Sequence, residues 1–277
     1  MSTRTTPFPR TAVLGAGSMG FAIIQGLLAA GAAEVSATCA SSQRAELLRS
    51  RADNGLNVVP VEEHPDANRR VVADAELVVV AVKPKYVPAV LADIADVLPA
   101  GATVISVAAG ITVSQLHEAV PGHGVIRAMP NTPALVGRGV TGVVLPDDLD
   151  EATKRLAREV VATLGAVVEI REEQIDALSA VSGSGPAYFY LFVEQLTEAA
   201  RRLGFDEPTA RRLVEDTFIG SAVLLEKGEA SPQELRRQVT SPGGTTMEAV
   251  AVFETGAWAD LAERAYQAAI EKARRLV

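Results

Sequence analysis

Three glycines near the start of the chain, in Gly15-Ala16-Gly17-Ser18-Met19-Gly20, are spaced as G-x-G-x-x-G. Alone this string is a weak signal, because glycine-rich turns are common. Here an aliphatic run, Thr11–Leu14, precedes it and a helix-like segment, Phe21–Ala30, follows it, as in a strand–turn–helix unit. In that context the glycines let the backbone approach a pyrophosphate at the helix N-terminus. The pattern predicts a dinucleotide site, and its alternative is a tight turn without a ligand.

The residues about twenty positions further on indicate which dinucleotide binds. An NAD site usually has an Asp or Glu at the end of its second strand, where the acid holds the ribose 2′-hydroxyl. The corresponding segment here, Thr38–Arg44, contains Ser41, Ser42 and Arg44 but no acid. Hydroxyls and a guanidinium suit a 2′-phosphate, so the segment favours NADPH over NADH as the cofactor. The two serines could also cap the next helix, and both interpretations can hold together.

Two further segments follow buried strands, at the edge where open α/β sheets bind ligands. Ala81-Val82-Lys83-Pro84 ends one of them, and its lysine could face a cofactor ribose or reach solvent. Val107-Ala108-Ala109 ends another with small side chains, which leave room for a flat ring or permit tight helix packing. The rigid loop Met129–Pro133 follows a third strand and could form a cofactor or substrate wall.

A second glycine-rich loop, Thr240–Thr246, precedes a predicted helix late in the chain. Backbone N–H groups at a helix N-terminus form an anion site, so a substrate carboxylate could bind there. The alternative is an ordinary Pro-Gly connection between helices. A related segment, Ser182–Pro186, interrupts an otherwise helical run.

The elements that must position these segments form two halves. Up to Arg171, short apolar runs alternate with helical segments, which implies βαβ crossovers and a parallel sheet. The expected strands are 11–14, 34–39, 77–82, 103–107, 124–128, 142–145 and 166–170. The rest of the chain shows only helical periodicity, at 186–203, 207–227, from Ser231 onward, at 246–254 and at 257–276. We therefore predict an α/β protein with a Rossmann-type parallel-sheet domain at 1–170 and an all-helical domain at 171–277.

Composition limits the possible functions. The chain has 277 residues, of which 48% are hydrophobic and 22% charged, enough to fill the cores of two domains without disulfide or metal support. Its single cysteine, Cys39, fits a reducing cytoplasm, and with three scattered histidines it does not provide a structural zinc site. A net charge of −8 without a basic stripe argues against nucleic-acid binding. No apolar run predicts a signal sequence or a membrane span.

Six motifs in this order resemble those of the pyrroline-5-carboxylate reductase family: G-A-G-x-M, A-V-K-P, S-V-A-A-G-I, M-P-N-T-P, S-G-S-G-P-A-Y and S-P-G-G-T-T. The likeness extends from about Arg10 to Glu271, and the last two motifs are the specific ones. It implies NADPH-dependent reduction of 1-pyrroline-5-carboxylate to L-proline, the last step of proline biosynthesis. It also implies that the helical domain is a dimerisation domain, that homodimers often assemble into homodecamers, and that each active site combines the nucleotide domain of one subunit with helices of its partner.

The resemblance also implies site residues. The cofactor would contact Leu14, Gly15, Ala16, Gly17, Ser18, Met19, Gly20, Ser41, Ser42, Asn68, Ala81, Val82, Lys83, Pro84, Val107, Ala108 and Ala109. The substrate would contact Glu229 and the backbone amides of Gly244, Thr245 and Thr246. The Thr246 hydroxyl would lie near the ring nitrogen of the substrate, as a hydrogen-bond partner or as a proton donor. Thr246 is therefore the catalytic candidate.

Two other functions fit part of the pattern. A 3-hydroxyisobutyrate-type dehydrogenase also joins a Rossmann half to a helical half. The catalytic lysine and asparagine of that family are not in place around Ser182–Tyr190. A non-catalytic NADP-sensing regulator would keep Gly15–Gly20 but has no reason to keep a second anion loop at Gly243–Thr246.

Overall fold

The computed structural model describes residues 8–51 and 56–275. The chain forms two compact units: a first unit that ends at Gly183 and takes up the chain again from Ile270, and a second unit, Ser184–Ala269. Residues 1–7, where the sequence shows no signal-like run, and Leu276, the expected end of the last helix, lie outside the described residues.

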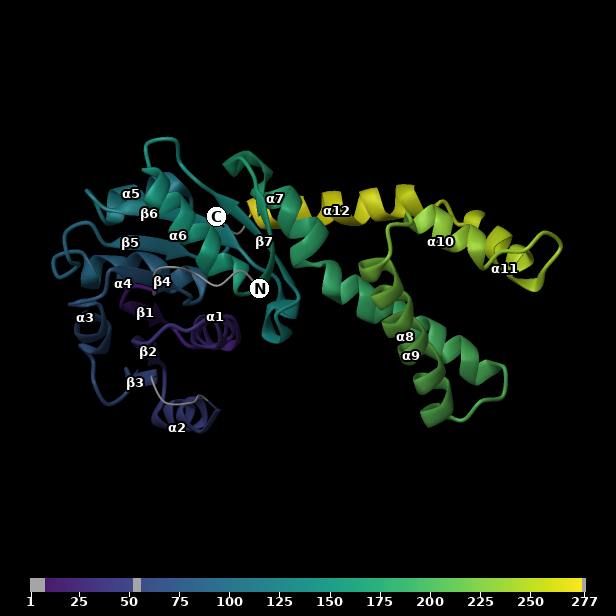
Figure 1. The fold of residues 1–277 in the computed structure, drawn as a ribbon, viewed down its shortest axis with the longest axis horizontal. Coiled ribbons are helices and arrows are strands. Elements are labelled where there is room, and N and C mark those ends of the chain that lie inside the picture. Colours follow the sequence, from purple (N-terminus) through teal and green to yellow (C-terminus); the bar gives the residue numbers. More distant parts are fainter. Residues whose placement is uncertain (1–7, 52–55, 276–277) are drawn as a thin grey trace. The chain divides into compact units, whose positions relative to one another are not determined.

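The first unit is built on an eight-stranded sheet in the order β3-β2-β1-β4-β5-β6-β7-β8 (Figure 1). Neighbouring strands from β3 to β6 pair in parallel, so their carboxyl ends meet at one edge. This arrangement confirms the predicted Rossmann-type α/β fold. The strands are β1 (Thr11–Leu14), β2 (Val35–Cys39), β3 (Leu56–Pro60), β4 (Leu77–Val80), β5 (Thr103–Ser106), β6 (Gly124–Met129), β7 (Gly139–Val144) and β8 (Gly165–Glu169).

The sheet departs from the predicted parallel arrangement at one pairing. β7 runs antiparallel to β6, with Arg127 opposite Val144. The connection between them is short and contains only a 3₁₀ turn, η2 (Thr132–Val136), whereas a parallel pairing needs a longer crossover. β8 is again parallel to β7, because helix α6 (Glu151–Ala162) supplies that crossover.

β3 is a strand that the sequence analysis did not predict. It pairs with β2 at the end of the sheet order, and its register places Pro60 beside Cys39. It is short and ends in a proline, which weakens the strand signal and is tolerated at a sheet edge.

Helices pack on both faces of the sheet because alternate strand residues point to opposite sides. On β1, Val13 joins one hydrophobic cluster, whereas Ala12 and Leu14 join the other. The first cluster includes residues of α1, α2 and α6, and the second includes residues of α3, α4 and α5. These helices are α1 (Ser18–Ala29), α2 (Ser42–Arg51), α3 (Ala67–Val72), α4 (Val87–Ile94) and α5 (Val113–Ala119), with α6 as given above.

The chain leaves the sheet through short helical turns. After β8 come η3 (Glu172–Gln174), α7 (Ile175–Leu178) and a π-helical turn, η4 (Ser179–Gly183). The second unit then contains helices only: α8 (Gly185–Arg202), α9 (Glu207–Lys227), α10 (Pro232–Gln238), α11 (Thr245–Glu254) and most of α12 (Trp258–Arg274). Inside it the Phe192 ring packs edge-on against Phe218 and Trp258, with centroids 5.8 and 5.2 Å apart.

Carboxylates cap several of these helices. Asp150 accepts a hydrogen bond from the Thr153 N–H at 2.8 Å, and Asp206 accepts one from the Thr209 N–H at 3.0 Å. Ser231 and Glu234 form a capping box at the start of α10. Hydrogen bonds from Thr153 lower the pKa of Asp150, and hydrogen bonds from the side chain and backbone of Thr209 lower the pKa of Asp206. The carboxyl groups of Asp150 and Asp206 therefore bind a proton less readily in the folded protein than in the unfolded chain.

These lowered pKa values predict acid sensitivity. A carboxyl with a lowered folded-state pKa stabilises the fold fully above its unfolded-state pKa, and this stabilisation is lost as the pH falls through the folded-state pKa. We expect the Tm to change little between about pH 7 and pH 5 and to fall below about pH 4, where free carboxyls protonate. Thermal melting curves recorded from about pH 7 to below about pH 4 test this expected pH dependence of the Tm. In a variant with Asp150→Asn and Asp206→Asn the fall should be smaller, and an identical fall would contradict the assignment.

Candidate functional site

The G-x-G-x-x-G segment forms the turn between β1 and α1. Gly15 has φ +90°, and a Cβ there would lie 2.9 Å from the Val82 backbone nitrogen. A Cβ on Gly20 would lie 2.4 Å from the Gly15 carbonyl oxygen. A Cβ on Gly17, in contrast, would meet no described atom within 4 Å. The outer glycines are thus required by the turn itself, whereas the middle one borders open space.

This open space lies at the N-terminus of a helix. Gly17 is the N-cap of α1, and both Gly17 and Ser18 are exposed. The first turn of α1 contains no acidic residue, and a glycine N-cap has no side chain to accept its N–H groups. Backbone donors and the positive end of the helix dipole therefore face the gap. The segment fits the pyrophosphate of a dinucleotide.

A buried threonine links this turn to Asn68 on α3. The Gly15 N–H lies 3.2 Å from both the hydroxyl and the carbonyl oxygen of Thr38, and the Ala16 N–H donates to the same carbonyl at 2.7 Å. The Thr38 hydroxyl donates to Asn68 Oδ1 at 2.9 Å. Two hydrogen bonds through Thr38 therefore link Asn68 to the phosphate turn, Gly15–Gly20. Sequence reasoning missed Thr38, although a polar residue near the end of a buried strand was an available signal.

We expect Thr38→Val to loosen this turn. The substitution keeps the shape of the side chain but removes its hydroxyl, which joins Gly15 to Asn68 in a residue that is only 1% exposed. The loss of a buried hydrogen-bond partner costs about 1–3 kcal/mol, which corresponds to a Tm lower by several degrees. Differential scanning fluorimetry measures this shift, and Ser36→Ala, on the same strand but half-buried, is the control. An equal Tm for Thr38→Val and wild type would contradict the role of Thr38.

The serines that were expected near the adenosine end lie at the start of α2. The Ser41 hydroxyl accepts the Arg44 N–H at 3.3 Å, so the helix-capping interpretation is confirmed for Ser41. The Ser42 N–H donates to Glu62 Oε2 at 3.2 Å, and the Ser42 hydroxyl donates to the Glu63 carboxylate. Sequence reasoning missed both acids, because they follow the unpredicted strand β3.

Arg44 joins the two segments. Its Nε donates to the Ala16 carbonyl at 3.0 Å, and its guanidinium lies 6.0 Å from the centre of the Phe21 ring. The guanidinium is thus held against the phosphate turn. One cation and two carboxylates therefore surround the N-terminus of α2.

The ends of β4 and β5 lie along the same edge of the sheet. The Ala81 N–H donates to the Leu14 carbonyl at 2.8 Å. Val82 lies so close to Gly15 that a Cβ at Gly15 would be 2.9 Å from the Val82 backbone nitrogen. Lys83 is exposed and precedes the 3₁₀ turn η1 (Pro84–Tyr86). Of the small residues after β5, Ala109 is exposed and Val107 is half-buried. Ala108 is only 5% exposed and joins the hydrophobic cluster on its side of the sheet.

The loop after β6 has a structural role inside the first unit. Asn131 is 8% exposed, its Nδ2 donates to the Ser182 carbonyl at 2.9 Å, and its Oδ1 accepts the Val140 N–H at 2.8 Å. It fastens the π-helical turn to β7. The predicted interruption at Ser182–Pro186 is this turn followed by the start of α8.

The expected substrate residues all lie in the second unit. Gly243 has φ +69°, Gly244 is the N-cap of α11, and Thr245 and Thr246 are exposed in its first turn. The N-terminus of this ten-residue helix has the geometry of an anion site. Glu229 is exposed between α9 and α10.

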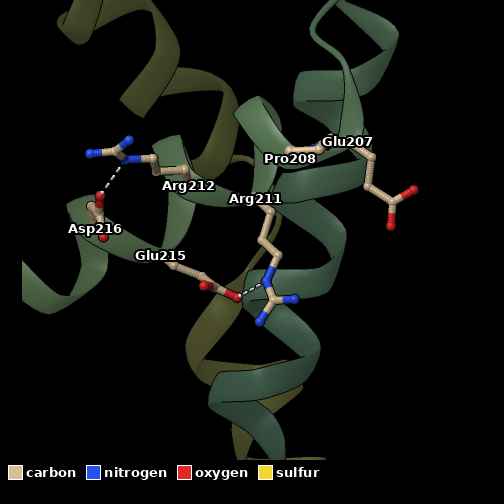
Figure 2. Close-up of a pocket in the computed structure, with 6 residues that line it drawn as sticks. All are labelled: Glu207, Pro208, Arg211, Arg212, Glu215 and Asp216. Atoms are coloured by element: carbon tan, nitrogen blue, oxygen red, sulfur yellow. Dashed lines mark hydrogen bonds and ion pairs between the residues drawn. The ribbon is translucent and has the colours of Figure 1, made fainter.

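A surface pocket on α9 lies apart from these residues. It is lined by Glu207, Pro208, Arg211, Arg212, Glu215 and Asp216. Figure 2 shows that its cations pair within the helix, Arg211 with Glu215 at 2.7 Å and Arg212 with Asp216 at 3.3 Å. Because both arginines of the pocket are already paired with acids of the same helix, the pocket is a weaker candidate than the glycine turns.

Within residues 8–51 and 56–275, no group of three or more His, Cys, Asp or Glu side chains could hold a metal ion. In the same ranges, no helix is both long and apolar enough to cross a membrane.

Burial raises the pKa of the Cys39 thiol, so this cysteine stays protonated inside the core.

Family models match both halves of the chain. Residues 10–110 match the model described as NADP oxidoreductase coenzyme F420-dependent. Residues 172–276 match the model described as pyrroline-5-carboxylate reductase dimerisation. The first covers the phosphate turn and the ends of β2, β4 and β5, and the second covers the glycine loop before α11.

Individual proteins match over nearly the full length. A pyrroline-5-carboxylate reductase of Pseudomonas aeruginosa is 39% identical over 97% of this chain and 97% of its own. Among solved structures, a reductase of this name from Coxiella burnetii has a TM-score of 0.88 and 34% identity over 97% of this chain and 98% of its own. One from Plasmodium falciparum with NADP bound has a TM-score of 0.78 and 28% identity over 96% of this chain and 97% of its own.

These matches confirm the resemblance inferred from the six motifs. They extend across both units, and the fold agrees with that of the solved relatives. The chain belongs to the pyrroline-5-carboxylate reductase family.

Proposed function

We propose that this protein reduces 1-pyrroline-5-carboxylate to L-proline with NADPH, the last step of proline biosynthesis. The observation that carries the proposal is 39% identity, over nearly the whole chain, to a reductase of that name. The open helix N-terminus at Gly17 supports it independently, because it fits a dinucleotide pyrophosphate. A relative with NADP bound and the NADP oxidoreductase model support NADPH as the cofactor, with NADH as the less favoured one.

The residues of the first unit would hold the cofactor. NADPH supplies the hydride that reduces the imine carbon. The turn Leu14–Gly20 would bind the pyrophosphate, Ser41 and Ser42 would lie near the 2′-phosphate, and Asn68 would contact the cofactor beside them. The segments Ala81–Pro84 and Val107–Ala109 would line the nicotinamide ribose and ring.

The residues of the second unit would orient the substrate. The amides of Gly244, Thr245 and Thr246 would bind its carboxylate at the N-terminus of α11, where the helix dipole favours an anion. The Thr246 hydroxyl would hydrogen-bond the ring nitrogen, and Glu229 would contact the ring. The cyclic imine already contains its nitrogen, so the chemistry requires neither a Schiff-base lysine nor a metal. Orientation and electrostatics supply most of the rate.

Self-association is part of the proposal. The dimerisation model over residues 172–276 supports a homodimer of the helical domain. We propose that these dimers assemble further into a homodecamer, as the family resemblance implies. The second unit exposes large aliphatic side chains, among them Leu224 at 66% and Val252 at 72%, which a partner could cover.

We also propose that the boundary between the dinucleotide-binding domain and the helical domain lies between residues 170 and 171. A cytoplasmic location fits the single buried thiol, Cys39.

The loss of NADPH absorbance after addition of 1-pyrroline-5-carboxylate to the purified protein tests the function, with L-proline quantified in parallel. We expect proline to form in equal amount to the NADPH consumed and more slowly with NADH. Folded protein that binds NADPH but oxidises neither cofactor would exclude the reductase activity. If the protein instead oxidised a hydroxy acid while reducing NADP⁺, the result would favour a dehydrogenase.

A further inference from the structure

We propose that Glu62 and Glu63 set how strongly this enzyme discriminates between NADPH and NADH. The inference rests on the proposed function, because it takes the first turn of α2 as the site of the adenosine 2′ position. Sequence reasoning found no acid at the end of β2. The structure brings two acids there from the end of β3, which lies beside β2 with Pro60 opposite Cys39.

Both acids occupy donors that a 2′-phosphate would use. The Ser42 N–H donates to Glu62 at 3.2 Å, and the Ser42 hydroxyl donates to Glu63. These groups belong to the first turn of a ten-residue helix, whose dipole attracts negative charge. A carboxylate and a phosphate compete for such a position. In the structure, the carboxylates of Glu62 and Glu63 therefore already occupy the N–H and the hydroxyl of Ser42.

This competition affects the two cofactors in opposite ways. A 2′-phosphate must displace the carboxylates and then lie near their charge, which weakens NADPH binding. A ribose 2′-hydroxyl can instead donate to a carboxylate, as it does to the acid at the end of the second strand in NAD sites. Glu62 and Glu63 are exposed, so they can swing aside and NADPH still binds. Arg44, held at the Ala16 carbonyl, partly offsets their charge. The two acids therefore reduce the difference in affinity between NADPH and NADH.

Binding of two adenosine fragments tests this without turnover. Calorimetric titration of the full-length protein with adenosine 2′,5′-bisphosphate and with 5′-AMP compares ligands that differ only in the 2′-phosphate. For Glu62→Gln with Glu63→Gln we expect the Kd of the bisphosphate to fall about five- to tenfold, as for the loss of exposed charge repulsion. The Kd of 5′-AMP should stay equal or rise. The gain should shrink at high salt, because exposed charges are screened.

Glu34→Gln is the control, because it removes one negative charge from an exposed residue that precedes β2, at the opposite edge of the sheet. It should leave the ratio of the two Kd values unchanged. The proposal is wrong if the double variant shifts the ratio no more than this control, or if it binds the bisphosphate more weakly than wild type does. Reduction of 1-pyrroline-5-carboxylate is measured separately, so loss of the proposed function would leave this binding result interpretable.

Discussion

Replacement of Gly17 with alanine is expected to raise the Kd of NADPH about ten- to hundredfold, since overpacking by a methyl group costs about 1–3 kcal/mol. A Cβ at this position enters the space at the N-terminus of α1 where the pyrophosphate would lie. The apo protein should tolerate the change, because no described atom lies within 4 Å of that Cβ and φ is −71°. The Tm should differ from wild type by no more than about 3 °C.

Gly20→Ala supplies the contrast. Its Cβ would lie 2.4 Å from the Gly15 carbonyl oxygen, so the backbone of the turn must move. We expect a clear loss of Tm together with the loss of NADPH binding. Fluorescence titration with NADPH and thermal melts separate the two variants. If Gly17→Ala binds NADPH as wild type does, the pyrophosphate does not lie at this turn.

Replacement of Thr246 with alanine is expected to lower kcat about ten- to hundredfold, as for loss of one hydrogen bond that strengthens in the transition state. The Kd of NADPH should stay unchanged, because Thr246 is in the second unit and is assigned to the substrate. Its side chain is exposed in the first turn of α11, so the fold does not require it. Thr246→Ser keeps the hydroxyl and should recover most of the rate.

Thr255→Ala is the matched control for this prediction. Thr255 follows the same helix at its other end, where its hydroxyl donates to the Val252 carbonyl at 2.7 Å. Its removal should leave kcat within about twofold of wild type. A full pH–rate profile separates the two roles of Thr246. If the hydroxyl relays a proton, the loss should reach about 10²–10⁴-fold and the basic limb of the profile should change. Wild-type kcat and KM in Thr246→Ala would remove Thr246 from the site.

Much of this site could be predicted from local sequence. The glycines at 15, 17 and 20, the run before them and the helix after them specify a strand–turn–helix unit, because each feature acts within a few residues of chain. The capping box at Ser231 and the helix start after Gly244 are local in the same sense. The order of six motifs then identified the family, since together they span both units.

The tertiary structure decided what depends on pairing between distant segments. β7 runs antiparallel because its connection is too short for a crossover, which composition does not reveal. Thr38 meets Asn68 and Gly15, and Glu63 meets Ser42, only because β3, β2 and β1 are neighbours in the sheet. Periodicity tells which face of a strand is buried but not which strand lies beside it. The sequence therefore determined the dinucleotide turn, whereas strand order decided which charges surround the adenosine end.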